Sequence, residues 1–299
     1  MNLMNMIKRI LLITSLLLSW TLSAQQPYES TAEDIALGEM ILRDLSTAAA
    51  TQDGSELMVR AARAMLGQEY VPNTQEGREE KLRIYLTKTD CILFVDNTLG
   101  LVRTAQQYRD QASFEHLAEL LEPMRFDEVR RAKGYEPYAT RVHYVTEWIA
   151  RGVARDIFRD LTPELGGVPD TRKIDFMFMH PDSYAALTGE SPTAAVNRRD
   201  IARMEDELDW IPRSYIPKDK VPGIESQIRS GDILCFATSI DGLDYSHVVI
   251  AYRAKKGDRL SFIHASSAAG KVIIEPRTLE AYLQAHGKIS GISVLRLNQ

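Results

Sequence analysis

The sequence predicts an α+β fold, in which helices come first along the chain and an antiparallel sheet comes second. Two patterns predict it. Apolar residues recur at helical spacing in the first half, and short runs of β-branched and aromatic residues begin after Gly231. One layer of helices against one sheet is the expected packing of such a chain. With 299 residues, 44% of them hydrophobic and 26% charged, the composition is that of a globular protein.

The N-terminus has the pattern of a signal peptide. Two basic residues precede the apolar run 10–18, and small residues ending at Ala24 follow it. The run is shorter than the ~20 residues that a membrane-spanning helix needs, so a retained anchor is the weaker interpretation. We therefore expect residues 1–24 to be removed, and residues 25–299 to form one periplasmic or secreted domain without a membrane span.

Helical spacing dominates residues 25–160. The helices expected there cover residues 32–66, a stretch that starts near Thr89 or Asp90, 113–121 and 140–150. Gly67 is a usual helix stop, and a loop follows it. The helix that starts near Asp90 has a broad apolar surface, which predicts a buried, central helix.

Residues 160–230 are rich in Pro and Gly, and we expect loops there with one helix at 198–208. The β half, residues 231–299, contains turn residues between its apolar runs. Its expected strands are 232–238, 247–253, 259–264, 271–275 and 289–297.

Charge and motif content exclude several classes of function. The net charge is -5, and the 36 Lys and Arg residues are scattered, so we expect no binding to nucleic acid. The sequence contains no metal-ligand spacing and no Gly-rich phosphate loop, so we expect no metal and no cofactor. A monomer is expected.

The two cysteines occupy different contexts. An exported protein with two cysteines forms a disulfide by default, which keeps a Cys91–Cys235 bridge open as an alternative. Cys235, however, lies inside a strand-like run, where a free cysteine packs as a small hydrophobe. Cys91 opens a helix, and the free amides of a first helical turn lower the pKa of a thiol. Cys91 is therefore a candidate nucleophile.

Two histidines lie on consecutive predicted strands. His247 starts one strand and His264 ends the next, and a short hairpin loop would place them directly opposite each other. One imidazole can then orient the other, which accepts the thiol proton. His143 is the alternative base if this hairpin register is wrong.

At this point the chain resembles the NlpC-type, papain-like cysteine peptidase superfamily, and within it the N-acetylmuramoyl-L-alanine amidase-like branch. The matching motifs lie in family order at 66–70, 90–95, 140–148, 230–233, 246–249 and 263–272. The resemblance implies a papain-like fold, with Cys91 as nucleophile, His247 as general base and His264 as the residue that orients His247. It also implies an oxyanion hole formed partly by the Cys91 amide, with Tyr70 nearby.

One departure concerns the residues after the nucleophile, since Ile92 and Leu93 stand where relatives have small or hydroxyl residues. Arg141, Tyr144 and Trp148 would share one face of the expected 140–150 helix. In that arrangement the arginine could bind a peptide carboxylate, and the two aromatic rings could pack against a sugar. The alternative is that the aromatic rings pack in the core and that Arg141 forms a salt bridge. The residues expected to contact substrate are Tyr70, Asp90, Arg141, His143, Tyr144 and Trp148.

The resemblance implies hydrolysis of an amide bond in peptidoglycan fragments through a thioester, between N-acetylmuramic acid and L-alanine. One alternative is an endopeptidase of the same fold that cuts between D-glutamate and the diamino acid. In that enzyme the Asp90 carboxylate would bind the free amine of L-alanine. The other is a non-catalytic cell-wall binding protein with the Cys91–Cys235 disulfide.

Overall fold

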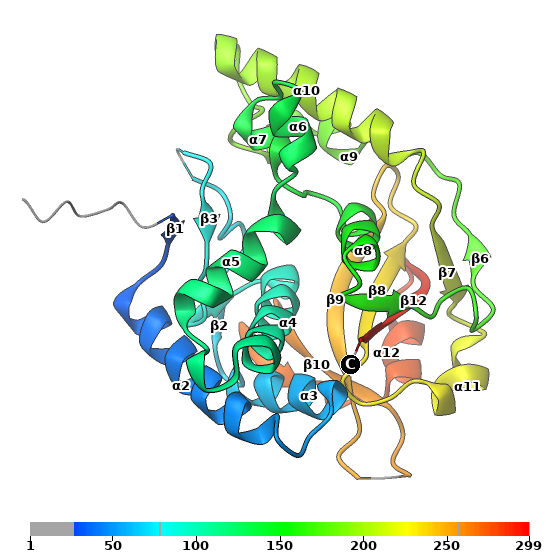
Figure 1. The fold of residues 1–299 in the computed structure, drawn as a ribbon. Helices are drawn as coiled ribbons and strands as arrows, with labels where there is room; N and C mark the ends of the chain where they lie inside the picture. The colour runs from blue at the N-terminus through cyan, green and yellow to red at the C-terminus, as the bar shows by residue number, and fades with distance from the viewer. Residues whose placement is uncertain (1–26, 78, 256, 299) are drawn as a thin grey trace, which may run out of the picture.

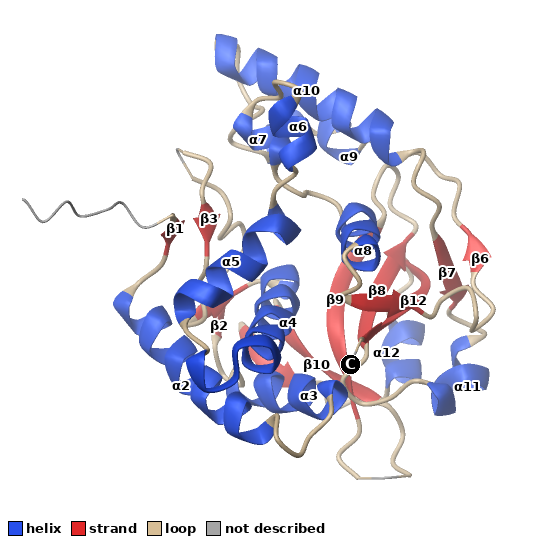
Figure 2. Ribbon diagram, viewed as in Figure 1, coloured by secondary structure: helices blue, strands red, loops and turns tan. Residues whose placement is uncertain are grey.

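The computed structural model describes residues 27–77, 79–255 and 257–298. Figure 1 shows the helices of the first half gathered on one side of a curled mixed sheet, and Figure 2 separates the two kinds of element by colour. The prediction of an α+β fold is confirmed. The predicted signal peptide lies outside the described residues, and among those described no helix is long and apolar enough to cross a membrane.

Side-chain caps determine where the helices of the first half begin. The predicted stretch 32–66 is two helices rather than one, because Asp53 and Glu56 form a capping box that starts the second. Ser113 caps the fourth. These helices are α2 (Ala32–Ala48), α3 (Gly54–Ala64), α4 (Cys91–Tyr108) and α5 (Phe114–Arg125), with the 3-10 turn η1 (Arg109–Gln111) between the last two.

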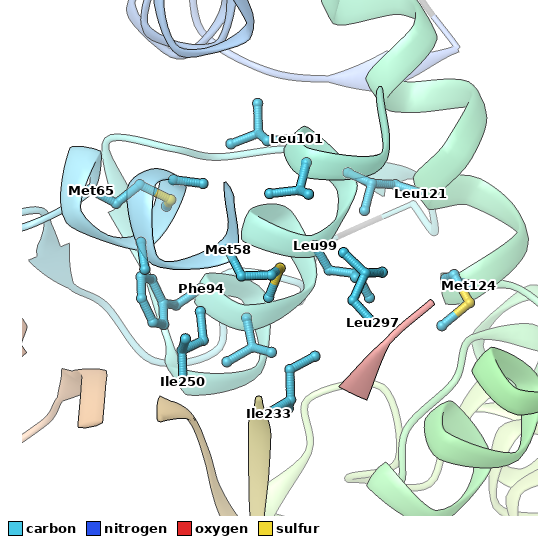
Figure 3. Close-up of a cluster of buried hydrophobic side chains, with 14 of the residues drawn as sticks. Met58, Met65, Phe94, Leu99, Leu101, Leu121, Met124, Ile233, Ile250 and Leu297 are labelled. Carbon is cyan, nitrogen blue, oxygen red and sulfur yellow. The ribbon is translucent and has the colours of Figure 1, made fainter. Parts of the chain in front are cut away.

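Helix α4 is buried and central, as predicted. It packs against α2, α3, α5 and the sheet. Helix α5 packs closely against α4 at Gly100. A Cβ atom at this position would lie only 2.8 Å from side-chain carbons of Leu117 and Leu121, so a larger residue would not fit without a shift. Figure 3 shows the resulting core. It joins apolar side chains of these helices to the sheet: Met58, Met65, Phe94, Leu99, Leu101, Leu121, Met124, Ile233, Ile250 and Leu297.

The single helix predicted over 140–150 is wrong. Two helices, α7 (Pro137–Thr140) and α8 (Val145–Ala154), flank an extended segment. Arg141 has extended backbone dihedrals and forms an isolated bridge with Phe126, which interrupts the helix. A short helix, α6 (Glu128–Ala132), precedes them.

The predicted strands of the β half are all present, and the prediction of an antiparallel sheet there is confirmed. They are β8 (Ile233–Thr238), β9 (Tyr245–Tyr252), β10 (Ser261–Ser266), β11 (Lys271–Ile274) and β12 (Ile289–Leu297). The sheet has the order β4-β2-β11-β10-β9-β8-β12-β7-β6, and β5 also pairs with β12. Thus β12, the last of these strands in sequence, lies between β8 and β7.

The sequence did not reveal the short strands, because two to four residues carry no readable periodicity. They include β1 (Tyr28–Glu29), β2 (Glu69–Tyr70), β3 (Leu82–Arg83), β4 (Lys88–Thr89), β5 (Phe158–Asp160), β6 (Val168–Pro169) and β7 (Ser214–Pro217). Helix α12 (Leu279–Ala285) was also missed, since Leu279 and Leu283 are its only buried residues.

The segment 160–230 holds more helix than predicted. The predicted helix at 198–208 is the second half of α10 (Pro192–Leu208), which begins earlier because Ser191 caps it and Pro192 occupies its first position. Figure 1 shows α10 running above α6, α7 and α9. The remaining helices are α9 (Phe176–Met179), η2 (Pro181–Ser183), α11 (Val221–Ile224) and η3 (Glu225–Gln227).

Candidate active site

Cys91 is the first residue of α4, at a position fixed by its neighbours. Asp90 caps the helix, and its carboxylate accepts a hydrogen bond of 2.9 Å from the Leu93 amide. Strand β4 ends at Thr89 and pairs in parallel with β2, so Tyr70 lies opposite Thr89. The predicted helix start is therefore confirmed, and Tyr70 is brought beside the thiol.

The predicted low pKa of the Cys91 thiol is wrong. The residue is half-buried, but protein surrounds its sulfur, and burial together with the Asp90 carboxylate raises the pKa of Cys91 to about 12. The backbone amides of Val248, Ile92 and Cys91 oppose this rise without cancelling it. Cys91 and Cys235 are both free, which removes the disulfide alternative for this structure.

A testable consequence is slow alkylation at neutral pH. Iodoacetamide reacts with the thiolate, so its rate with Cys91 at pH 7 should be well below that of an unperturbed cysteine, and should rise about tenfold per pH unit up to pH 10. Mass-spectrometric labelling rates measure this. Cys91→Ser should take up no label, because Cys235 is fully buried. A rate that is already maximal at pH 7 would contradict the raised pKa.

His247 and His264 form the predicted pair, with 2.7 Å between His247 Nε2 and His264 Nδ1. The predicted register, which placed them directly opposite, is wrong by two residues. Ile263 pairs with Ile250, and no pair follows it along the two strands. Because side chains alternate between the two faces of a sheet, a register shift of two residues leaves both histidines on the same face. The imidazoles therefore contact each other as diagonal neighbours, beyond the last paired residues of the two strands.

Apolar aromatic rings enclose the histidine pair. His247 lies edge-on to Phe236, and His264 lies edge-on to Phe262. Burial is the largest cause of the lowered pKa values, to about 3 for His247 and about 4 for His264. Both imidazoles are therefore neutral at pH 7. Burial thus favours the neutral form of the thiol as well as of the two imidazoles.

Three residues near the pair were missed from the sequence. Glu275 Oε2 lies 3.4 Å from His264 Nε2. Tyr282 of α12 packs edge-on to His264, and its pKa is raised by burial, by Glu275 and by the neighbouring Cys91. His286 stacks on Tyr282 and contributes to the low pKa of His247.

A cavity of about 260 Å³ joins the thiol to His247. Larger hollows exist elsewhere, such as one of about 900 Å³ beside Trp210, but they contain neither the thiol nor the histidine pair. Tyr70 and His264 do not line the cavity. Most predicted site residues do: Asp90, Cys91, Arg141, His143, Tyr144, Trp148 and His247.

Arg141 lines this cavity but is neutralised by the protein itself. Its guanidinium lies 2.5 Å from Glu76 and 2.9 Å from Glu80, and it is nearly fully buried. Burial is also the largest cause that raises the pKa of Glu80 to about 7. The salt-bridge alternative considered for Arg141 is thus present. The predicted shared helical face with Tyr144 and Trp148 is wrong, because no helix spans the three residues.

The other aromatic and histidine candidates are anchored by protein partners. The Tyr144 hydroxyl donates to Glu205 over 2.6 Å, and the Trp148 indole N–H donates to Asp96 over 3.0 Å. Trp148 also belongs to the main core, as its alternative interpretation held. His143 Nε2 lies 2.8 Å from the Tyr138 carbonyl, and burial holds its pKa well below the usual value.

The sequence also failed to mark the charged floor of the cavity. Arg125 donates to Asp96 over 2.6 Å and to Asn97 over 2.5 Å, and it also contacts the Arg83 carbonyl. Asp96 lies on α4, the helix that begins at Cys91. Met177 and Tyr184, from the 160–230 segment, also line the cavity. In the described part of the chain, no group of three His, Cys, Asp or Glu side chains is arranged to hold a metal.

The fold and cavity define an α+β protein in which a helix-start thiol and one member of a hydrogen-bonded histidine pair line the same cavity. A family model described as AmiA-like, N-acetylmuramoyl-L-alanine amidase-like, matches residues 60–292. The chain belongs to this AmiA-like amidase family. A hydrolase acting on amide bonds is the class of enzyme that the family indicates.

Solved structures agree with this family. A crystal structure of an N-acetylmuramoyl-L-alanine amidase from Bacteroides uniformis is 29% identical, with a TM-score of 0.73 over 82% of this chain and 99% of that one. A Bacteroides fragilis protein, provisionally described as a xylanase, is also 29% identical, with a TM-score of 0.70 over 79% and 99%. A Legionella pneumophila protein is 18% identical, with a TM-score of 0.62 over 88% and 96%, and shares the fold alone. Among curated proteins no match was found.

Proposed function

We propose that this protein is a cysteine amidase with an NlpC-type, papain-like fold that separates N-acetylmuramic acid from L-alanine in peptidoglycan fragments. The observation that carries the proposal is the hydrogen-bonded histidine pair, whose His247 shares a cavity with the thiol of Cys91 at the start of a buried helix. Family membership and the amidase from Bacteroides uniformis support the substrate class.

In the proposed mechanism, Cys91 is the nucleophile and His247 is the general base. His247 Nε2 is engaged by His264, so Nδ1 is the nitrogen left to accept the thiol proton. Because thiol and imidazole are both neutral at rest, the proton moves as sulfur attacks the carbonyl. His247 then donates that proton to the leaving amine, and water hydrolyses the thioester.

Developing negative charge on the carbonyl oxygen needs preorganised donors. The Cys91 backbone amide at the helix start supplies one, and the Val248 amide is directed to the same side, toward the thiol. The Tyr70 hydroxyl lies close enough to Cys91 for the thiolate charge to raise its pKa, although burial is the larger cause. These groups support an oxyanion site next to the sulfur.

The cavity walls support a bulky substrate. Met177 and Tyr184, from the 160–230 segment, line the same cavity as Cys91 and offer apolar and aromatic surface for a sugar. In this proposal Arg141 takes a peptide carboxylate in place of Glu76. Glu76 is the more exposed of its two partners, with 25% of its side chain exposed against 8% for Glu80.

Asp90 favours the amidase over the endopeptidase. An endopeptidase would need the Asp90 carboxylate to read a free L-alanine amine. Here the carboxylate is occupied by the amides of Leu93 and Ile92 at the helix start, and burial raises its pKa. A helix cap that is already satisfied is a poor site for a cationic amine. The peptidoglycan substrate class also supports the proposed export of the mature chain.

The proposal is tested by products. Incubation with a defined muropeptide should release the intact peptide with an L-alanine N-terminus and the free sugar, both read by mass spectrometry. Cys91→Ala provides the inactive control, because it removes the nucleophile. Release of an L-alanyl-D-glutamate dipeptide would instead assign the endopeptidase activity, and no cleavage of any muropeptide would refute both.

A further inference from the structure

Glu275 is a buried carboxylate placed behind the histidine pair. It follows β11, whose Ile273 pairs with His264, so Glu275 lies two residues further along the same face. Its amide donates to the Phe262 carbonyl over 2.9 Å, which ties it to β10. The residue is 4% exposed, and the facing His264 is 2% exposed. We propose that Glu275 is a positioning residue that fixes the tautomers of both His264 and His247.

The tautomers follow from one shared proton. For His247 to accept the thiol proton at Nδ1, its own proton must sit on Nε2 and be donated to His264 Nδ1, 2.7 Å away. His264 Nδ1 is then an acceptor, so the His264 proton must sit on Nε2. The base is therefore competent only when both imidazoles carry their protons on Nε2.

Glu275 is the group that selects this state. His264 Nε2 is fully buried and has no hydrogen-bond partner among the described residues, and Glu275 Oε2 faces it at 3.4 Å. An acceptor-only carboxylate there favours a protonated Nε2 and penalises a lone pair at that nitrogen. The separation is long for a hydrogen bond, as is common for catalytic contacts in free enzymes, and should shorten when charge develops on the imidazoles.

Arg277 keeps Glu275 ionised and in place. Its guanidinium lies 2.6 Å from Glu275 Oε1, and its amide donates to the same oxygen over 3.2 Å. These bonds lower the pKa of Glu275 against the opposing effect of burial. One oxygen is thus fixed by Arg277, and the other is left for His264. When His247 takes the thiol proton, the carboxylate stabilises the imidazolium through the intervening ring.

The inference rests on the proposed cysteine mechanism, but its first test does not depend on turnover. Long-range ¹H–¹⁵N spectra of the histidine side chains distinguish Nε2–H from Nδ1–H tautomers. In the resting wild-type protein at pH 7, His247 and His264 should both carry the proton on Nε2. A His264 spectrum showing Nδ1–H would overturn the assignment to Glu275, whatever substrate the enzyme takes.

The second test is kinetic. Glu275→Gln offers an amide that can donate as well as accept, so the tautomers should mix, and kcat on a muropeptide should fall about tenfold with KM within about twofold. Glu225→Gln is the matched control, since Glu225 is also a buried carboxylate paired with an arginine, Arg259, and it accepts the Leu260 amide. It should retain wild-type kcat and tautomers.

Equal kcat and identical histidine spectra in the Glu275→Gln and Glu225→Gln variants would overturn the inference. If Glu275→Gln does not fold, the tautomer of His264 in the wild-type spectrum still tests the inference, because an Nδ1–H tautomer would contradict it. If the wild-type protein cleaves no muropeptide, the proposed function fails, and the spectra of wild type and variant still show whether Glu275 sets the tautomers.

Discussion

His247→Ala should lower kcat at least about 10³-fold while the protein stays folded, because general-base catalysis contributes on that scale. His247 lies near the start of β9 and is only partly buried, so its truncation removes little of the core. The measurement is kcat on a defined muropeptide, with circular dichroism to verify folding.

His264→Ala should be milder, with a loss of about 10- to 100-fold, since an orienting group is removed and the base itself remains. His116, which stacks on Tyr108 outside the cavity, provides the control variant His116→Ala with unchanged kcat. Full activity of His247→Ala would refute the assigned base and direct attention to His143. Equal losses in the His247 and His264 variants would refute the division of their roles.

Asp96→Asn should lower the free energy of unfolding by about 3–5 kcal/mol, because it leaves the Arg125 guanidinium buried without its counter-ion. Both side chains of this pair are 3–4% exposed, so solvent cannot replace the lost charge. Asp96 also accepts the Trp148 indole N–H, and an amide nitrogen at that position would face one of the two donors. Urea denaturation at pH 7 measures the change.

Asp44→Asn is the matched control for this effect. Asp44 binds Arg60 through both carboxylate oxygens, at 2.5 and 2.6 Å, but the two side chains are 48% and 43% exposed. Exposed pairs of this kind contribute less than about 1 kcal/mol. If the two substitutions cost the same free energy, the stability of the cavity floor does not depend on its buried ion pair.

The sequence predicted the parts of the site that follow from local periodicity. A cap followed by a broad apolar surface located Cys91 at the start of a buried helix, and the β-branched runs located His247 and His264 on neighbouring strands. The two histidines were predicted to lie directly opposite each other, which was wrong because the 253–260 connection is centred one residue further along the chain than the hairpin assumed. The prediction that both side chains lie on the same face of the sheet was nevertheless correct, since a shift of two residues preserves the alternation of side chains.

Long-range packing explains most of what was missed. The low thiol pKa was expected from the helix start alone, whereas the raised value comes from burial and from Asp90, which no spacing reveals. Arg141 was assigned to substrate because its partners Glu76 and Glu80 lie in a distant loop. Glu275 was within reach of prediction, because the strand at 271–275 was recognised and alternation along it places Glu275 on the face of His264.

The interior position of β12 bears on how the chain is made. While residues up to 288 are being synthesised, β8 and β7 have no partner between them, and each leaves a row of backbone amides and carbonyls unpaired. The β half can therefore close only after residues 289–297 have emerged from the ribosome. Until then the thiol-bearing helix lacks its finished support, and the open strand edges are sites at which an incompletely folded chain is prone to aggregate.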